Sequence, residues 1–177
     1  LTYGAPTLTD AFVADGVTDD DVLQLAASLE RYSKHPLARP IVAAAEARGL
    51  KLSDASEVRE RPGGGLEGVV NGQTIRVVGR GHAAREGWGA QLPPLASGLE
   101  CVVAVNGRYA ATYRFHDAPR EDSGQFIGHL AAGHHLVRVL IVSGDREEEV
   151  RYLASRVGVS EVFAGQSPEQ KVAITRA

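Results

Sequence analysis

Two stretches near the N-terminus carry apolar residues at helical spacing. In the first, three aspartates precede a single apolar face, and we expect a helix over residues 19–31 whose acidic first turn suits the helix dipole. Its apolar positions are Val22, Leu23, Leu25, Ala26 and Leu29. A second helix is expected to begin at Pro36, because proline suits the first helical position, and to run through Ala45 before Gly49 stops it.

The middle of the chain alternates short apolar runs with turn residues. Asn71-Gly72 and Asn106-Gly107 each separate two such runs, and Asn-Gly is a strong signal for a β-hairpin. The expected strands are residues 58–61, 66–70, 74–78, 101–105 and 109–115. Antiparallel hairpins together with two helices predict an α+β unit over roughly residues 11–113.

Helices and strands alternate in the last third. Helices are expected over 122–132 and 147–157, each ended by a glycine, and a final helix from Pro168. The apolar run 137–142 is typical of a buried parallel strand, and Val162-Phe163 of a short second one. This is a doubly wound α/β pattern. It is too short for a complete sheet, so we expect its first strand and its continuation outside residues 1–177.

Composition narrows the class of protein without naming a function. The chain has 177 residues, a net charge of −3 and 44% hydrophobic residues, which are ordinary globular values. No apolar run approaches the roughly 20 residues of a membrane span, and the N-terminus lacks a signal-peptide pattern. With Cys101 as its one cysteine, the chain has no intramolecular disulfide and no cysteine-built zinc site. We expect a soluble, cytoplasmic chain with no nucleic-acid partner and no membrane contact of its own.

Polar residues directly after the apolar strand of the last third are one candidate for chemistry. Ser143-Gly144-Asp145 is expected at the carboxyl end of that strand, where a hydroxyl, a backbone N–H and a helix N-terminus can hold a phosphate oxygen. A plain strand-to-helix turn capped by serine is the alternative. Lys171, in the first turn of the last helix, can reach the same edge to neutralise a phosphoryl group or an aspartate, or is a solvated lysine.

A second candidate region lies in the α+β unit. Residues 63–68 fit G-x-G-x-x-G, but a hairpin follows, which excludes a dinucleotide fingerprint and leaves close approach of the backbone to a ligand. Glu30 and His35 lie across the break between two helices. There a carboxylate and an imidazole can read the edge of a base, or simply form a helix corner.

Histidines and the cysteine offer weaker signals. His129, His134 and His135 share no ligand spacing with a carboxylate pair, so we expect a solvated loop and no metal site. Cys101 opens a hairpin strand and is expected to be a small buried hydrophobe rather than a nucleophile.

These motifs follow one another in a fixed order. Glu30 precedes the run Ser33-x-His35-Pro36-Leu37-Ala38, and the pairs Gly63-x-Gly65 and Val78-Gly79 come next. After them stand Asp117, Ser143-Gly144-Asp145 and Pro168-x-x-Lys171, while the chain opens with Leu1-Thr2-Tyr3-Gly4. In this order they resemble the motifs of one protein region. These motifs are S-x-H-P-L-A, G-x-G, V-G-N, S/T-G-D and P-x-x-K, together with the tail of D-K-T-G-T-L-T-x-G. That region is the cytoplasmic ATP-binding region of heavy-metal-transporting, copper-transporter-like P-type ATPases.

The resemblance implies two domains. An incomplete haloacid-dehalogenase-like α/β phosphorylation domain would take residues 1–10 and 114–177. An inserted α+β nucleotide-binding domain, built on an antiparallel sheet, would take residues 11–113. In the latter, His35 would stack on or orient adenine, and Glu30 would hydrogen-bond its edge. Gly63 and Gly65 would let the phosphates approach the backbone, and Gly79 would belong to the same site.

For the phosphorylation domain, the resemblance implies an aspartate upstream of Leu1 that attacks the γ-phosphate of ATP. Ser143 and the backbone at Gly144 would bind its oxygens, and Lys171 would neutralise its charge. Asp145 and Asp117 would complete the catalytic set, with Mg²⁺ contributing much of the neutralisation. The implied partners are the membrane and actuator domains of a parent pump, which would stand in a bacterial inner membrane.

Three departures from the family pattern stand out. Arg80 replaces the asparagine after V-G, and Arg146 the asparagine that often follows G-D. The chain also begins after the phosphorylated aspartate and ends before the G-D-G-x-N-D segment, so alone it is expected to bind ATP without turnover. Two other functions stay open. One is a haloacid-dehalogenase-like phosphatase with a cap, which needs an N-terminal D-x-D. The other is a nucleotide sensor that hydrolyses nothing.

Overall fold

The structure, a computed structural model, describes residues 2–119 and 139–176. Its contacts divide the chain into two compact units. The larger unit comprises Pro6–Leu95 and Leu99–His116, and the smaller comprises Leu1–Ala5, Ala96–Gly98 and Asp117–Ala177. The division into domains 1–10, 11–113 and 114–177 stays a prediction.

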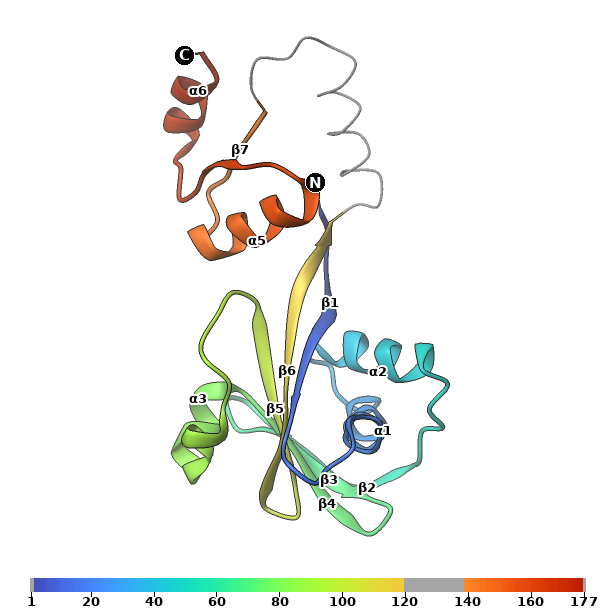
Figure 1. The fold of residues 1–177 in the computed structure, drawn as a ribbon. Coiled ribbons are helices and arrows are strands. Elements are labelled where there is room, and N and C mark those ends of the chain that lie inside the picture. Colours follow the sequence, from blue (N-terminus) through green and yellow to red (C-terminus); the bar gives the residue numbers. More distant parts are fainter. Residues whose placement is uncertain (1, 120–138, 177) are drawn as a thin grey trace. The chain divides into compact units, whose positions relative to one another are not determined.

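A six-stranded sheet forms the framework of the larger unit (Figure 1). Its strand order is β1-β6-β5-β4-β3-β2, and neighbouring strands from β2 to β6 pair antiparallel. The strands are β1 (Thr2–Val13), β2 (Ala55–Arg61), β3 (Gly65–Val70), β4 (Gln73–Val78), β5 (Leu99–Val105) and β6 (Arg108–Pro119). The antiparallel sheet of the α+β prediction is thereby confirmed.

Both predicted hairpins form at their Asn-Gly turns. Asn71 and Gly72 join β3 to β4 with φ angles of 49° and 75°, and Asn106 and Gly107 join β5 to β6 with 50° and 74°. Positive φ at both central residues is the backbone of a type I′ turn, whose twist matches that of the flanking strands. These turns fix the register that decides which side chains of β3 to β6 face each side of the sheet.

Helices cover the two faces of this sheet unequally. α1 (Asp19–Glu30) and α2 (Ala38–Ala47) pack on one face, and α3 (Arg80–Ala83) with the short turns η1 (Ala84–Trp88) and η2 (Gly89–Gln91) on the other (Figure 1). Side chains of β5 alternate between the two cores: Cys101 and Val103 join the larger, and Val102 and Ala104 the smaller around Trp88.

Several features of this unit differ from the sequence expectations, among them the helical turns α3, η1 and η2, which were not expected. The second helix begins at Ala38 rather than at Pro36. The turn before it uses side chains in place of helical bonds, since the N–H of His35 donates to Ser33 Oγ (3.0 Å) and that of Leu37 to His35 Nδ1 (3.2 Å). Strand β1 was not expected at all. It gains its ladder from β6, a strand about a hundred residues away in the sequence, and no local pattern reveals such a partner.

The smaller unit has the alternating α/β order that the sequence predicts. Strands β7 (Leu140–Val142) and β8 (Glu161–Phe163) pair in parallel, and α5 (Glu147–Val157) connects them. α6 (Pro168–Arg176) follows. Ile141, Val150, Ala154 and Val157 form its buried core, and Gly158 ends α5 in the left-handed conformation with φ 78°. The expected helix 122–132, the start of the run 137–142 and His129, His134 and His135 lie outside the described residues.

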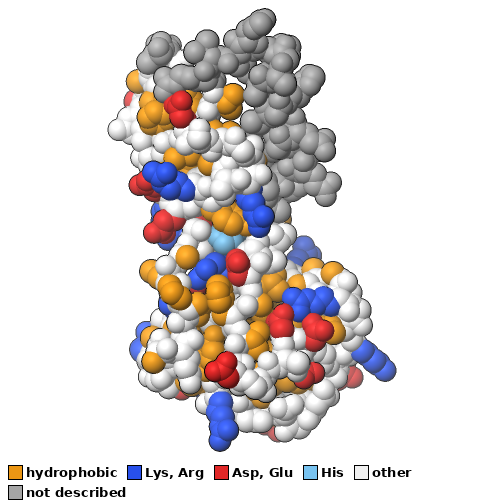
Figure 2. Space-filling view, viewed as in Figure 1, with side chains coloured by type: hydrophobic (Ala, Val, Ile, Leu, Met, Phe, Trp, Pro, Cys, Tyr) orange, Lys and Arg blue, Asp and Glu red, His pale blue; other side chains and the backbone are white. Residues whose placement is uncertain are grey.

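None of the described helices has the length and apolarity needed to span a bilayer. On the face drawn in Figure 2, acidic and basic side chains are interspersed, and no broad area carries one sign of charge. The expectation of no nucleic-acid partner stays a prediction.

Candidate functional site

A cleft of about 580 Å³ opens within the larger unit. All five residues predicted for nucleotide binding line it: Glu30, His35, Gly63, Gly65 and Gly79. They come from four separate places, namely the end of α1, the turn before α2, the β2–β3 connection with the first residue of β3, and the residue after β4. Folding therefore brings together positions that are far apart in the sequence. They meet beside the antiparallel strands β3 and β4.

Glu30 is a buried acid in the wall of this cleft. It ends α1, is 5% exposed, and its Oε2 atom has no hydrogen-bond partner among the described residues. Burial raises the pKa of its carboxyl from 4.5 to about 7, because the charged form loses its hydration. The nearby Ser33 hydroxyl lowers this pKa and the charge of Glu60 raises it, both less than burial does. At neutral pH the carboxyl is therefore poised between its two protonation states.

His35 is an exposed ring held in a fixed orientation. Its Nδ1 accepts the backbone N–H of Leu37 at 3.2 Å, which requires Nδ1 to be unprotonated and places the proton of the neutral ring on Nε2. Ser33 Oγ accepts the N–H of His35 and donates to Glu60 Oε1 at 2.8 Å. Ser33 thus links the histidine turn to β2, and the imidazole is presented as a rigid flat surface at the cleft.

The three predicted glycines have different reasons to be glycine. At Gly65, with φ 82°, a Cβ would lie 2.3 Å from the carbonyl oxygen of Val77, so close packing of β3 on β4 demands its absence. Gly63 has φ 68° but open space around it. Gly79 has an ordinary φ of −74° and no atom within 4 Å of a Cβ placed on it. Nothing in the described structure requires glycine at Gly79, and the free space beside it faces the cleft.

The cleft also holds basic side chains that no sequence motif marks. Arg61 and Arg85 line it and make no ion pair within the described residues, while His82 Nε2 lies 3.1 Å from Glu86 Oε1. Arg85 follows Gly79 by more than one helical turn. It lies at the cleft because the chain turns back through α3 and η1. The sequence signal for these residues was a group of basic side chains after Val78-Gly79. That group alone did not indicate a site, because its position at the cleft depends on the turns of α3 and η1.

Arg80, which replaces the family's asparagine, is tied into the fold. Its Nη1 lies 2.7 Å from Glu100 Oε2, and its Nη2 donates to the carbonyl of Pro93. Arg114 donates to the other oxygen of Glu100 at 2.7 Å and to the carbonyl of Pro94 at 2.9 Å. Glu100, 5% exposed in its side chain, is thereby neutralised between two guanidinium groups.

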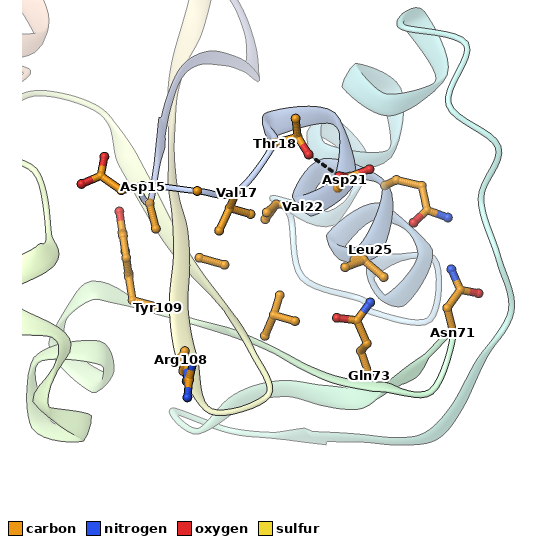
Figure 3. Close-up of a pocket in the computed structure, with 15 residues that line it drawn as sticks. Asp15, Val17, Thr18, Asp21, Val22, Leu25, Asn71, Gln73, Arg108 and Tyr109 are labelled. Atoms are coloured by element: carbon orange, nitrogen blue, oxygen red, sulfur yellow. Dashed lines mark hydrogen bonds between the residues drawn. The ribbon is translucent and has the colours of Figure 1, made fainter.

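A second cleft of similar volume lies elsewhere in the same unit (Figure 3). The β1–α1 loop, Asn71 in the β3–β4 turn, and Val105 and Arg108 on β5 and β6 line it. In Figure 3 the side chains of Asn71 and Gln73 rise toward α1, where Thr18 donates a hydrogen bond to Asp21. None of the predicted site residues lines this second cleft. The sequence motifs therefore single out the cleft beside Glu30.

The smaller unit gathers the other predicted residues in two adjoining loops. The loop after β7 holds Ser143, Gly144 and Asp145, and it is bonded to the loop after β8 through Ser143 N to Phe163 O and Gln166 N to Ser143 O, both 2.9 Å. A Cβ placed on Gly144 would lie 3.7 Å from Lys171 Nζ. The lysine of the P-x-x-K motif thus reaches the S-G-D loop, as expected for parallel strands that end at one edge.

Within that loop, Ser143 Oγ donates to Asp145 Oδ2 at 2.6 Å and accepts the N–H of Asp145 at 3.2 Å. Arg146, the second departure, is exposed and lies 3.3 Å from Glu149 on the first turn of α5. Asp117 is exposed near the end of β6, and no described hydrogen bond or ion pair connects it with Ser143 or Lys171. No group of three metal-ligating side chains occurs in residues 2–119 and 139–176.

Comparison with known proteins identifies the region that this chain resembles. No model of a known protein family matches it. It is 35% identical over 182 residues to the copper-transporting ATPase 1 of Rhizobium meliloti (strain 1021), covering 97% of this chain and 21% of that protein. It is 32% identical over 180 residues to the zinc/cadmium/lead-transporting P-type ATPase of Shigella sonnei (strain Ss046), covering 99% and 24%. The chain spans less than a quarter of the length of these two curated relatives.

Solved structures agree with the sequence matches. A crystal structure of a zinc-transporting PIB-type ATPase matches with a TM-score of 0.84 and 31% identity, over 99% of this chain and 29% of that one. The N-domain of HMA6, a copper-transporting P-type ATPase, matches with a TM-score of 0.51 and 28% identity, over 64% of this chain and 100% of the domain. The expected resemblance to heavy-metal P-type ATPases is confirmed.

Proposed function

Because this chain matches a region of heavy-metal P-type ATPases over nearly its whole length, we propose that its larger unit is a nucleotide-binding domain that holds ATP beside Glu30. The observation that carries the proposal is the convergence of Glu30, His35, Gly63, Gly65 and Gly79 on one cleft. A volume of about 580 Å³ lies in the usual range of small-molecule sites.

The base end of the nucleotide belongs at Glu30 and His35. The fixed imidazole gives a flat surface on which a purine can stack, and an orphaned buried oxygen of Glu30 needs a hydrogen-bond partner from a ligand. Leu66, Val77 and Val78 give the cleft its apolar wall. Stacking and one edge contact are together sufficient to orient a base.

The phosphate end belongs at Gly79, Arg61 and Arg85. The open space beside Gly79 allows the backbone N–H groups at the start of α3 to come close to an anion, and two guanidinium groups without ion pairs in the described part of the chain supply positive charge. ATP binds proteins of this kind as its Mg²⁺ complex, so the ion enters with the nucleotide as part of the substrate. Within the described residues, no three carboxylate, histidine or cysteine side chains form a group that could hold a metal ion.

The smaller unit is proposed to be part of a haloacid-dehalogenase-like phosphorylation domain. In a parent pump, an aspartate oxygen would attack the γ-phosphorus, the bond to the β,γ-bridging oxygen would break, and ADP would leave. Ser143 and the Gly144 backbone would hold the transferred phosphoryl oxygens, and Lys171 would neutralise them. Asp145 orients the Ser143 hydroxyl through their 2.6 Å hydrogen bond. Asp117 is assigned to this set by resemblance alone.

The parent would be a membrane pump that uses the aspartyl phosphate to drive transport of a heavy-metal ion, with copper as the first candidate. Membrane and actuator domains would be its partners, and this chain would lie on the cytoplasmic side of a bacterial inner membrane. The relatives named above are ATPases rather than phosphatases or nucleotide sensors, so neither alternative function is favoured.

Calorimetric titration of the 177-residue chain with ATP tests the proposal. We expect saturable binding without phosphate release, and a loss of affinity in His35→Ala that leaves the melting temperature of the free chain within about 2 °C of wild type. Lys34→Ala is the matched control, because it removes a side chain next to His35 that does not line the cleft. Absence of ATP binding, or equal losses in the two variants, would contradict the assignment.

A further inference from the structure

Either the charged or the neutral form of the Glu30 carboxyl can make one hydrogen bond to the edge of adenine. Such a contact therefore does not determine the protonation state of Glu30. The carboxyl is buried, forms no ion pair among the described residues, and leaves Oε2 without a partner there. A buried carboxylate without a cation is costly, whereas the neutral acid is not, and it brings a donor as well as an acceptor.

The edge of each purine distinguishes these two forms. Adenine presents an acceptor at N1 beside a donor at its exocyclic amine, so a neutral carboxylic acid complements both positions. Guanine presents donors at N1 and at its 2-amino group, so a carboxylate complements it better. A carboxyl that reads adenine at both positions must therefore carry a proton.

We propose that Glu30 binds the base as a neutral carboxylic acid, with its hydroxyl donating to N1 of adenine and its carbonyl oxygen accepting from the exocyclic amine. This deepens the proposed function and depends on it. Proton uptake at Glu30 then accompanies ATP binding above neutral pH, so alkaline pH weakens ATP binding and shifts base preference toward guanine.

The surroundings of Glu30 favour the proton. Glu60 on β2 adds a negative charge that raises the pKa of the carboxyl, and Cys101 on β5 is a buried, neutral thiol beside it. Glu100 on β5 is neutralised by Arg80 and Arg114. The other titratable or charged groups lining the cleft are His35, Arg61, His82 and Arg85. Within the described residues, none of these four side chains forms an ion pair with Glu30.

Affinity measured against pH tests the proposal on the full chain. Dissociation constants for ATP and GTP at pH 6.0 and 8.5 are compared for wild type and Glu30→Gln, whose amide can donate to N1 and accept from the amine as the neutral acid does. For wild type we expect ATP affinity to fall by up to about thirtyfold between these pH values, since each pH unit above the pKa costs tenfold. Glu30→Gln keeps its ATP affinity, and the ratio of the two affinities cancels every pH effect that the two proteins share, including titration of the γ-phosphate.

A second measurement needs no variant. We use 1-deaza-ATP, in which a C–H replaces N1, and expect it to bind wild type at pH 6.0 at least about tenfold more weakly than ATP, because the acid's hydroxyl loses its acceptor. Equal affinity of the two nucleotides for wild type would overturn the proposal. So would a ratio of wild-type to Glu30→Gln ATP affinity that does not fall between pH 6.0 and pH 8.5. In those outcomes ATP still binds, whereas failure of the proposed function is the absence of ATP binding at every pH.

Glu60→Gln is the matched control for charge at the cleft. Glu60 lies at the same cleft but is exposed and hydrogen-bonded to Ser33. We expect this variant to keep the alkaline loss of ATP affinity, with the midpoint of that loss at a slightly lower pH because a neighbouring negative charge is gone. If Glu60→Gln abolished the loss as completely as Glu30→Gln, the proton would not belong to Glu30 alone and the proposal would fail.

Discussion

Glu30 also makes the stability of the free chain depend on pH in a calculable way. The folded-state pKa of about 7 stands against an ordinary value of 4.5, so the folded chain holds this proton more tightly than the unfolded chain does. The stability contributed by the neutral acid is fully present below pH 4.5 and is lost as the pH rises through 7. Replacing Glu30 by glutamine removes this loss.

The size of the effect follows from the pKa difference. About 2.5 pKa units at about 1.36 kcal/mol each give a gain in unfolding free energy on the order of 3 kcal/mol for Glu30→Gln at pH 8, and little gain near pH 4.5. The low exposure of the side chain, 5%, means that solvent screens little of this energy. For a unit of about this size, such a gain raises the melting temperature by on the order of 10 °C.

Thermal and urea unfolding of both proteins at half-unit pH steps from 4.5 to 8.5 measures the difference. Glu46→Gln is the control, because Glu46 is an exposed carboxylate on α2 and its replacement removes the same charge without relieving burial. A stability difference for Glu30→Gln that stays constant across this range, or that changes sign to destabilising at pH 8, would refute the account of Glu30 as a buried, uncompensated acid.

The remaining predictions concern the glycines and the cations. Gly65→Ala should destabilise the chain by more than about 2 kcal/mol in urea unfolding, because its Cβ would overlap the Val77 carbonyl, whereas Gly79→Ala should leave stability nearly unchanged and weaken ATP binding in calorimetry. Equal destabilisation by the two would contradict the packing argument. Arg85→Ala should weaken ATP binding more than AMP binding, about tenfold against less than about threefold, and a uniform loss would place Arg85 away from the phosphates. Lys171→Ala in the parent pump should nearly abolish acid-stable labelling from radiolabelled ATP while the isolated chain keeps its ATP affinity, and normal labelling would remove Lys171 from the phosphorylation site.

Local signals in the sequence were sufficient for most elements of the fold. The aspartates and apolar face of α1, the two Asn-Gly turns and the glycine after α5 each act through neighbouring residues, and all were predicted correctly. Strand β1 was missed because its ladder is made with a distant strand. The predicted start of α2 was wrong because side chains of Ser33 and His35 took over the backbone groups of the turn.

The candidate site likewise has residues that the sequence predicted and residues that only the fold revealed. Glu30, His35 and the glycines were selected by motif, and their convergence on one cleft required the fold. Arg61 and Arg85 carry no motif, so their position at the cleft depends on a loop and on helical turns that the sequence did not reveal. The orphaned oxygen of Glu30 is likewise a property of packing, because its lack of a partner depends on every neighbour that the fold places beside it.

Cys101 gives this chain an intrinsic reporter of its cleft. The thiol is the single one in the sequence, lines the cleft, is 6% exposed, and has its pKa raised by desolvation, so a thiol reagent modifies it slowly in the folded chain. A molecule bound in the cleft covers the exposed part of this thiol and makes local openings of the sheet rarer. The slowing of one chemical reaction then reports occupancy in solution, on a protein that carries no label and no substitution.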